Sequence, residues 1–96
     1  MRYSGMGQFH VYCISDEQMQ PMYVGCSATP DRRYRQHRIS PLNRPLRDWL
    51  ALNSYSHQLE ILDSFDTVAL AMDAEMEYIN YLFPAFNRRW RRVFSV

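Results

Sequence analysis

Hydrophobic and polar residues alternate in three short stretches of this chain. The stretches at 9–14 and 22–26 are rich in β-branched and aromatic side chains, and turn-forming residues at 15–21 separate them. This arrangement predicts an antiparallel hairpin with a long loop. Apolar residues alternate with polar ones again near 57–63, where a third strand is expected. The pattern therefore predicts a small three-stranded sheet.

The alternation also assigns side chains to the two faces of the hairpin. Neighbours along a strand point to opposite faces, so Val11 and Cys13 share one face and Tyr12 lies on the other. In the second strand Tyr23 and Gly25 share a face because they are two residues apart. Tyr12 and Tyr23 are therefore expected to lie together on one face of the sheet.

Two short helices are expected between the second and third strands. A Thr-Pro pair at 29–30 provides a cap and a first helical position for a helix over 30–38. Arg33 and His37 are four residues apart, so they would share a face of this helix. Asn43 is expected to cap the second helix. That helix has an apolar stripe formed by Leu46, Trp49 and Leu50.

The longest helix is expected to begin at Asp66 or Thr67 and to end near 83–84. Its apolar residues recur at helical spacing, and both methionines among them are expected in the core: Val68, Met72, Met76, Ile79 and Phe83. At about 100° per residue, Glu75 lies beside this stripe and Glu77 points away from it. An acid at the border of an apolar stripe is costly unless something pairs with it, so Glu75 is a candidate site residue.

Length and composition narrow the class of protein. A chain of 96 residues supports one compact domain, 1–96, and its 47% hydrophobic content argues against disorder. No apolar run approaches the roughly 20 residues that span a membrane, and the first residues lack the apolar stretch of a secretory signal. We expect a monomer in the reducing cytoplasm with a mixed α/β (α+β) fold, a small antiparallel sheet flanked by helices. Cys13 and Cys26 are expected to be inert core thiols.

The charged residues point to phosphate only through their distribution. The net charge is +1, but all eleven basic residues are arginines, whose forked donors suit phosphate. A basic tail at 88–96 contains a cluster of four cations around an indole: Arg88, Arg89, Trp90, Arg91 and Arg92. Such a cluster would neutralise phosphates while the ring stacks on a base. A solvated tail with Trp90 folded onto the core explains it almost as well.

Taken in order, the polar residues resemble the GIY-YIG nuclease family. Tyr12 ends the run His10-Val11-Tyr12, the run Tyr23-Val24-Gly25 begins eleven residues later, and Arg33 follows Tyr23 by ten residues. The similarity continues through the Arg-Tyr-Arg-Gln-His run that ends at His37. It extends to the spacing of the family's glutamate, isoleucine and asparagine, which stand here as Glu75, Ile79 and Asn87. The resemblance covers roughly residues 8–89.

The resemblance implies a metal-dependent DNA endonuclease that hydrolyses one strand per site and so nicks DNA. Glu75 would hold one divalent ion, Mg²⁺ or Mn²⁺, and Arg33 would bind the phosphate. Tyr12 would activate the nucleophile as a base or as part of a water relay, Tyr23 would position phosphate or water, and His37 would supply or accept a proton. Without the family spacing, a salt bridge from Glu75 to an arginine explains that acid equally well.

Supporting and binding roles follow from the same resemblance. Gly25 would allow a close backbone approach, and Asn87 would fix the segment after the last helix through hydrogen bonds to backbone. Arg32, Arg35 and the tail cluster are the expected DNA contacts. Specificity would come from the region 39–56, the tail or a protein partner.

One departure from the family keeps other functions open. His10 replaces the first glycine of the family motif and is expected to be exposed, while Val24 in place of isoleucine is a minor change. The alternatives are a nucleic-acid-binding module that retains the scaffold but does not cut, and a structure-selective or RNA-directed nuclease.

Overall fold

The computed structural model describes residues 7–54 and 56–87. Its elements, in chain order, are β1 (Phe9–Asp16), β2 (Pro21–Ser27), α1 (Pro30–Gln36), a short 3₁₀ turn η1 (Pro41–Asn43), α2 (Arg44–Leu52), β3 (His57–Phe65) and α3 (Val68–Leu82). The expected mixed α+β fold is confirmed, because every strand and helix predicted from the pattern is present. No helix in this part of the chain is long and apolar enough to cross a membrane.

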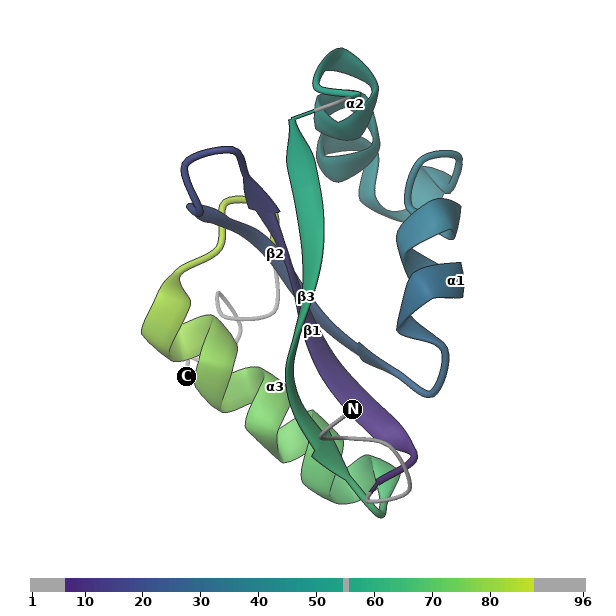
Figure 1. Ribbon diagram of the computed structural model, residues 1–96, viewed down its shortest axis with the longest axis vertical. Coiled ribbons are helices and arrows are strands. Elements are labelled where there is room, and N and C mark those ends of the chain that lie inside the picture. Colours follow the sequence, from purple (N-terminus) through teal and green to yellow (C-terminus); the bar gives the residue numbers. More distant parts are fainter. Residues whose placement is uncertain (1–6, 55, 88–96) are drawn as a thin grey trace.

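The three strands form one antiparallel sheet in the order β2-β1-β3. Tyr12 stands opposite Gly25 of β2 and Ile61 of β3, which places it at the centre of the sheet. Figure 1 shows α3 on one side of the sheet, with α1 and α2 on the other. The sheet therefore separates two layers of helices.

Each face of the sheet has its own core. On the α3 side, Val11 and Val24 pack with Ala71 and Ile79. On the other side, four buried side chains form the second core: Tyr12, Ile14, Leu46 and Leu50. Tyr23 packs against this second cluster, so the strand alternation placed both tyrosines on the correct face.

Two of the three expected helix starts use the predicted side chain. The Asn43 side chain accepts a hydrogen bond from the Leu46 N–H, and Thr67 accepts one from the Leu70 N–H at the start of α3. Thr29 precedes α1 as expected, but its side chain makes no capping hydrogen bond. The proline at the first position of α1 sets the backbone direction instead, because its φ already matches the helix.

The buried stripe of α3 differs from the one predicted. Ala71, Glu75 and Ile79 are its buried residues. Of the predicted stripe only Ile79 is buried: Val68, Met72 and Phe83 are exposed and Met76 is half-buried, so the prediction that both methionines lie in the core is wrong. The prediction weighted large apolar side chains, but small ones face the sheet here. Alanine lets the helix approach the strands closely, which moves the larger neighbours to its flanks. Glu75 therefore lies within the buried stripe instead of beside it, and Glu77 is exposed as expected.

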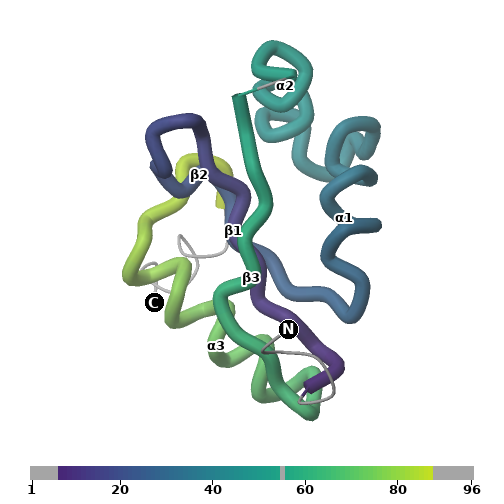
Figure 2. Tube along the Cα trace, in the orientation of Figure 1, coloured from purple at the N-terminus to yellow at the C-terminus, as the bar shows by residue number. Residues whose placement is uncertain are grey.

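The chain after α3 returns to the free edge of β2, as Figure 2 shows. The Phe86 N–H donates to the Met22 carbonyl at 2.8 Å. The Asn87 side chain accepts from the Val24 N–H and donates to the Val24 carbonyl, both at 2.8 Å. The predicted role of Asn87, fixing this segment through backbone hydrogen bonds, is confirmed. It also satisfies an otherwise open strand edge.

Asn87→Ala should lower the free energy of unfolding by about 2 to 4 kcal/mol, because two buried backbone groups of Val24 lose their partners. Urea unfolding followed by circular dichroism measures this. Asn80→Ala is the matched control, since the buried Asn80 Oδ1 has no hydrogen-bond partner among the described residues and little bonding is lost. Equal destabilisation by both variants would contradict the edge-capping role of Asn87.

Candidate active site

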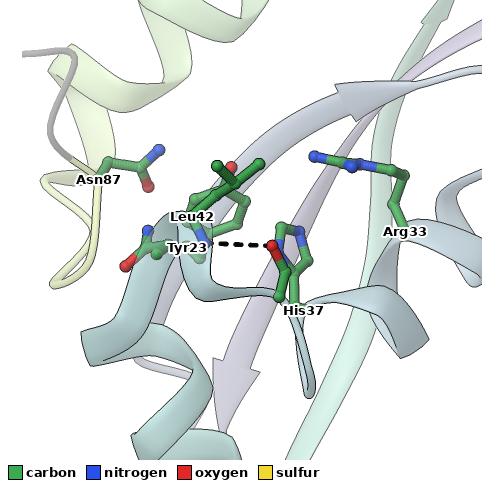
Figure 3. A pocket seen from close by; sticks show the side chains of 7 residues that line it. Tyr23, Arg33, His37, Leu42 and Asn87 are labelled. Atoms are coloured by element: carbon green, nitrogen blue, oxygen red, sulfur yellow. Dashed lines mark hydrogen bonds between the residues drawn. The ribbon is translucent and has the colours of Figure 1, made fainter.

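A pocket of about 190 Å³, lined mostly by residues with polar side chains, lies between β2, α1 and η1. Figure 3 shows Arg33 and Asn87 on opposite sides of it, with Tyr23, His37 and Leu42 between them. Four of these five residues were predicted site residues, although they are up to 64 positions apart in the sequence. The fold therefore brings together most of the polar set that the spacing singled out.

Tyr12 lies behind this pocket and contacts it through His37. The Tyr12 hydroxyl and His37 Nε2 are 2.8 Å apart, and the Tyr12 side chain is only 1% exposed. The Tyr23 ring packs edge-on against the His37 imidazole, with ring centroids 4.8 Å apart. His37 is thus held by one tyrosine through a hydrogen bond and by the other through ring packing.

Both members of the Tyr12–His37 pair are uncharged near neutral pH. Burial, with the nearby Tyr23 hydroxyl, raises the pKa of Tyr12, and the charge and hydrogen bonding of Arg33 only partly oppose that rise. Burial and the adjacent Arg33 guanidinium lower the pKa of His37 to about 4. A neutral phenol beside a neutral imidazole is best satisfied when the Tyr12 O–H donates to Nε2. His37 is then positioned as a proton acceptor.

Gly25 provides the space that the Tyr12 ring occupies. A Cβ atom on Gly25 would lie 2.5 Å from the Tyr12 Oη and 2.6 Å from Cζ, closer than side-chain atoms pack. Tyr12 and Gly25 are direct cross-strand partners, so the ring lies over the bare backbone of β2. The close approach predicted for Gly25 is confirmed, and its neighbour is the Tyr12 ring.

The three arginines of α1 occupy different positions. Arg33 lines the pocket, and its backbone carbonyl accepts the His37 N–H that ends the helix. Arg32 and Arg35 are exposed and are not part of the pocket lining. Arg33 is therefore distinguished from its neighbours by position, as the spacing indicated. The tail cluster at 88–92 lies outside the described residues.

Glu75 is buried, 4% exposed, but it is not part of the pocket lining. It lies on α3. Its negative charge adds to the rise in the pKa of Tyr12, so the two side chains interact electrostatically. Among the described residues, no group of three or more His, Cys, Asp or Glu side chains could hold a metal. One buried carboxylate fits Mg²⁺ or Mn²⁺ only if water and substrate phosphate supply the remaining ligands.

His10 is not exposed, contrary to the sequence expectation. Its side chain is buried, and Nδ1 lies 2.7 Å from the Ser64 hydroxyl on β3. The histidine therefore joins β1 to β3 instead of lying in solvent. Cys13 is buried and burial raises its thiol pKa, while Cys26 is half-buried; they are not joined in a disulfide. The expected inert role fits Cys13.

Three pocket residues were missed as site residues: Ser40, Leu42 and Asn43. The sequence marked Asn43 only as a helix cap, yet its Nδ2 also donates to the Phe86 carbonyl at 2.8 Å. No pattern of neighbouring residues in the sequence could have indicated this bond, because its two partners are 43 positions apart. His57, which belongs to no motif, has a hydrogen bond from Nδ1 to the Tyr34 hydroxyl and packs on Trp49.

Charge is strongly segregated between the two sides of the sheet. All six arginines of the described residues fall within 32–47, in α1, in α2 and in the turn after α1, and these two helices contain only two acids, Asp31 and Asp48. The stretch 57–87, which forms β3 and α3, contains six acids and no arginine. The near-neutral net charge therefore conceals a basic face around the pocket.

Comparisons of the chain with protein-family models, curated proteins and solved structures found no match. The function is therefore argued from the site itself.

The lowered pKa of His37 should make the protein less stable in mild acid. Between pH 6.5 and 4 the unfolded histidine binds a proton and the folded one does not, so the free energy of unfolding falls as the pH falls. The His37 contribution to this loss should reach about 3 kcal/mol near pH 4. Urea unfolding across this range measures it.

His37→Gln should flatten this slope, because glutamine keeps a hydrogen-bonding group near Tyr12 and does not titrate. His57→Gln is the control: burial and the Arg38 charge also lower the pKa of His57, so this variant should lose only that separate part of the slope and keep the His37 contribution. If the free energy of unfolding of His37→Gln falls with pH as steeply as that of the wild type, His37 binds a proton as readily in the folded as in the unfolded protein.

Proposed function

We propose that this chain is a GIY-YIG-type endonuclease, a metal-dependent phosphodiester hydrolase that nicks DNA. The observation that carries the proposal is the pocket itself, where Arg33 and Tyr23 surround a neutral His37 that is hydrogen-bonded to Tyr12. These residue types, in the order that resembles the family, supply a phosphate-binding cation and a proton acceptor in one place. Hydrolysis of a phosphodiester needs both.

Arg33 is the proposed phosphate ligand. Its guanidinium faces a pocket large enough for a phosphate group with several waters. The segregated arginines support the same assignment, because a phosphate backbone would be drawn to the face that contains α1 and α2. Arg32 and Arg35, exposed on the same helix, would contact flanking phosphates.

The Tyr12–His37 pair favours a relay over a tyrosine base. The raised pKa of Tyr12 makes its phenolate costly, so Tyr12 alone is a poor base near neutrality. In a relay, the Tyr12 oxygen takes a proton from water as its own proton passes to His37 Nε2. A bound phosphate would offset the Arg33 charge and raise the pKa of His37, which strengthens it as the final acceptor.

Glu75 is the residue proposed to hold the divalent ion. An ion bound there would supply charge stabilisation at the reacting phosphate. Glu75 is buried in the stripe of α3 that faces the sheet, and its charge acts on the pKa of Tyr12, which supports a role for Glu75 at the same site.

A non-cutting nucleic-acid-binding module is the second candidate. Two observations favour it: Tyr12 is almost completely buried, and Glu75 is absent from the pocket lining. A protein of this kind would bind DNA through the same basic face and leave the backbone intact.

Purified protein should convert supercoiled plasmid to nicked circles in Mg²⁺ or Mn²⁺ and not in chelator. The nicking rate should rise linearly with protein concentration, as for a monomer with one site. Glu75→Gln should reduce the rate at least about a hundredfold, while Glu77→Gln should not change it, because Glu77 is exposed on another face of α3. DNA binding without nicking by the wild type would favour the binding module.

Arg33→Lys should reduce nicking at least about tenfold although the charge is retained, because an ammonium does not reproduce a two-point contact with phosphate. Arg32→Lys is the matched control on the same helix and should lose little. Plasmid assays at several DNA concentrations separate effects on binding from effects on rate. Equal losses in both variants would mean that α1 binds DNA without a specific phosphate site.

A further inference from the structure

Leu42 is an apolar side chain in an unusual place. It lines the polar pocket beside Arg33 and His37, yet it is 84% exposed. A leucine of this exposure leaves most of its apolar surface in water, and burying it would be worth about 2 kcal/mol. Tyr23 lines the same pocket (Figure 3). A ligand that fills the pocket would therefore meet an apolar surface next to its phosphate.

The turn η1 holds Leu42 in this position. The Leu42 N–H donates to the Ser40 hydroxyl at 3.2 Å, the bond drawn as a dashed line in Figure 3. Pro41 restricts the backbone before it, and Asn43 after it bonds to both Leu46 and Phe86. Asn43 thus ties one end of the turn to α2 and to the segment after α3, while the Ser40 N–H before the turn donates to the Gln36 carbonyl of α1, and Leu42 between them is held away from both cores.

The surroundings of Leu42 match a nucleic acid better than an apolar partner. Arg33 lines the pocket with Leu42, and five more arginines lie in α1, in α2 and in the turn after α1, in a stretch whose only acids are Asp31 at its start and Asp48 at its end, which pairs with Arg47. Arg44, which directly follows the pocket residue Asn43, is exposed. An apolar protrusion surrounded by cations suits a molecule with charged phosphates and apolar base faces.

We propose that Leu42 is a wedge that contacts an unstacked base beside the scissile phosphate, so that the favoured substrate is DNA with an interrupted or branched duplex. The proposal rests on the proposed function and specifies its substrate. In continuous duplex the base faces are stacked and inaccessible, and opening a step costs a few kcal/mol. At a branch or gap the bases are already unstacked, so no opening cost remains and the leucine side chain can contact the exposed base face. Arg33 and Arg44 would hold the phosphates on either side.

The test uses three DNA molecules of the same sequence around one labelled phosphate: a continuous duplex, a gapped duplex and a flap. Cleavage in Mg²⁺ is measured for the wild type, Leu42→Ala and Leu52→Ala. The wild type should cut the gapped and flap substrates about tenfold faster than the continuous duplex. Leu42→Ala should bring this ratio close to one. Leu52 is 85% exposed and absent from the pocket lining, so Leu52→Ala should keep the wild-type ratio.

Binding of the same DNA in chelator provides a second readout that does not require cutting. Fluorescence of 2-aminopurine next to the interruption should rise on binding to the wild type and rise less with Leu42→Ala. A wild-type ratio of one, or an unchanged ratio in Leu42→Ala, would overturn the wedge while leaving the nuclease proposal intact. Absence of cutting with a Leu42-dependent binding preference would overturn the nuclease proposal alone. Absence of both binding and cutting would overturn both.

Discussion

The packing of one aromatic ring over one glycine determines the arrangement of the site. Tyr12 lies across Gly25, where any side chain would collide with the ring, and this directs its hydroxyl to His37. His37 is the C-cap of α1 and its N–H donates to the Arg33 carbonyl, so the bond to Tyr12 holds the end of this helix against the sheet. The positions of the α1 side chains in the pocket thus depend on the absence of a side chain at Gly25 of β2.

The electrostatics of the site follow from the same packing. Removing Tyr12 and His37 from water raises the pKa of the tyrosine and lowers that of the histidine. Both side chains are therefore neutral from about pH 4 to alkaline pH. Arg33 is then the cation nearest to this neutral pair. A site built in this way is prepared for an anion, because the entering phosphate finds an arginine and does not have to displace a competing carboxylate from the pocket lining.

Local patterns were sufficient for the strands, for two helix caps and for the shared face of Tyr12 and Tyr23, because alternation and capping depend on near neighbours. They failed where packing between distant elements decides. Met72 was expected in the core, but the alanines of α3 face the sheet and leave it at the flank. His10 was expected in solvent, but Ser64 on β3 binds it. The pocket role of Asn43 depends on a partner 43 positions away.

The distribution of charge explains how a chain with a net charge of +1 could select a polyanion. The six described arginines lie in α1, in α2 and in the turn after α1, whereas six of the ten acids lie in the stretch 57–87, so a phosphate would be drawn to the α1 and α2 side more than to the α3 side. Such a field would act over about a Debye length, roughly 8 to 10 Å in physiological salt. Under the proposed function it would orient the approach of DNA without holding it nonspecifically, as a uniformly basic protein would. The short-range contacts of Arg33 and of the turn that bears Leu42 would then position the phosphate in the pocket. The segregation would therefore govern the encounter, and the pocket would govern which phosphate is bound.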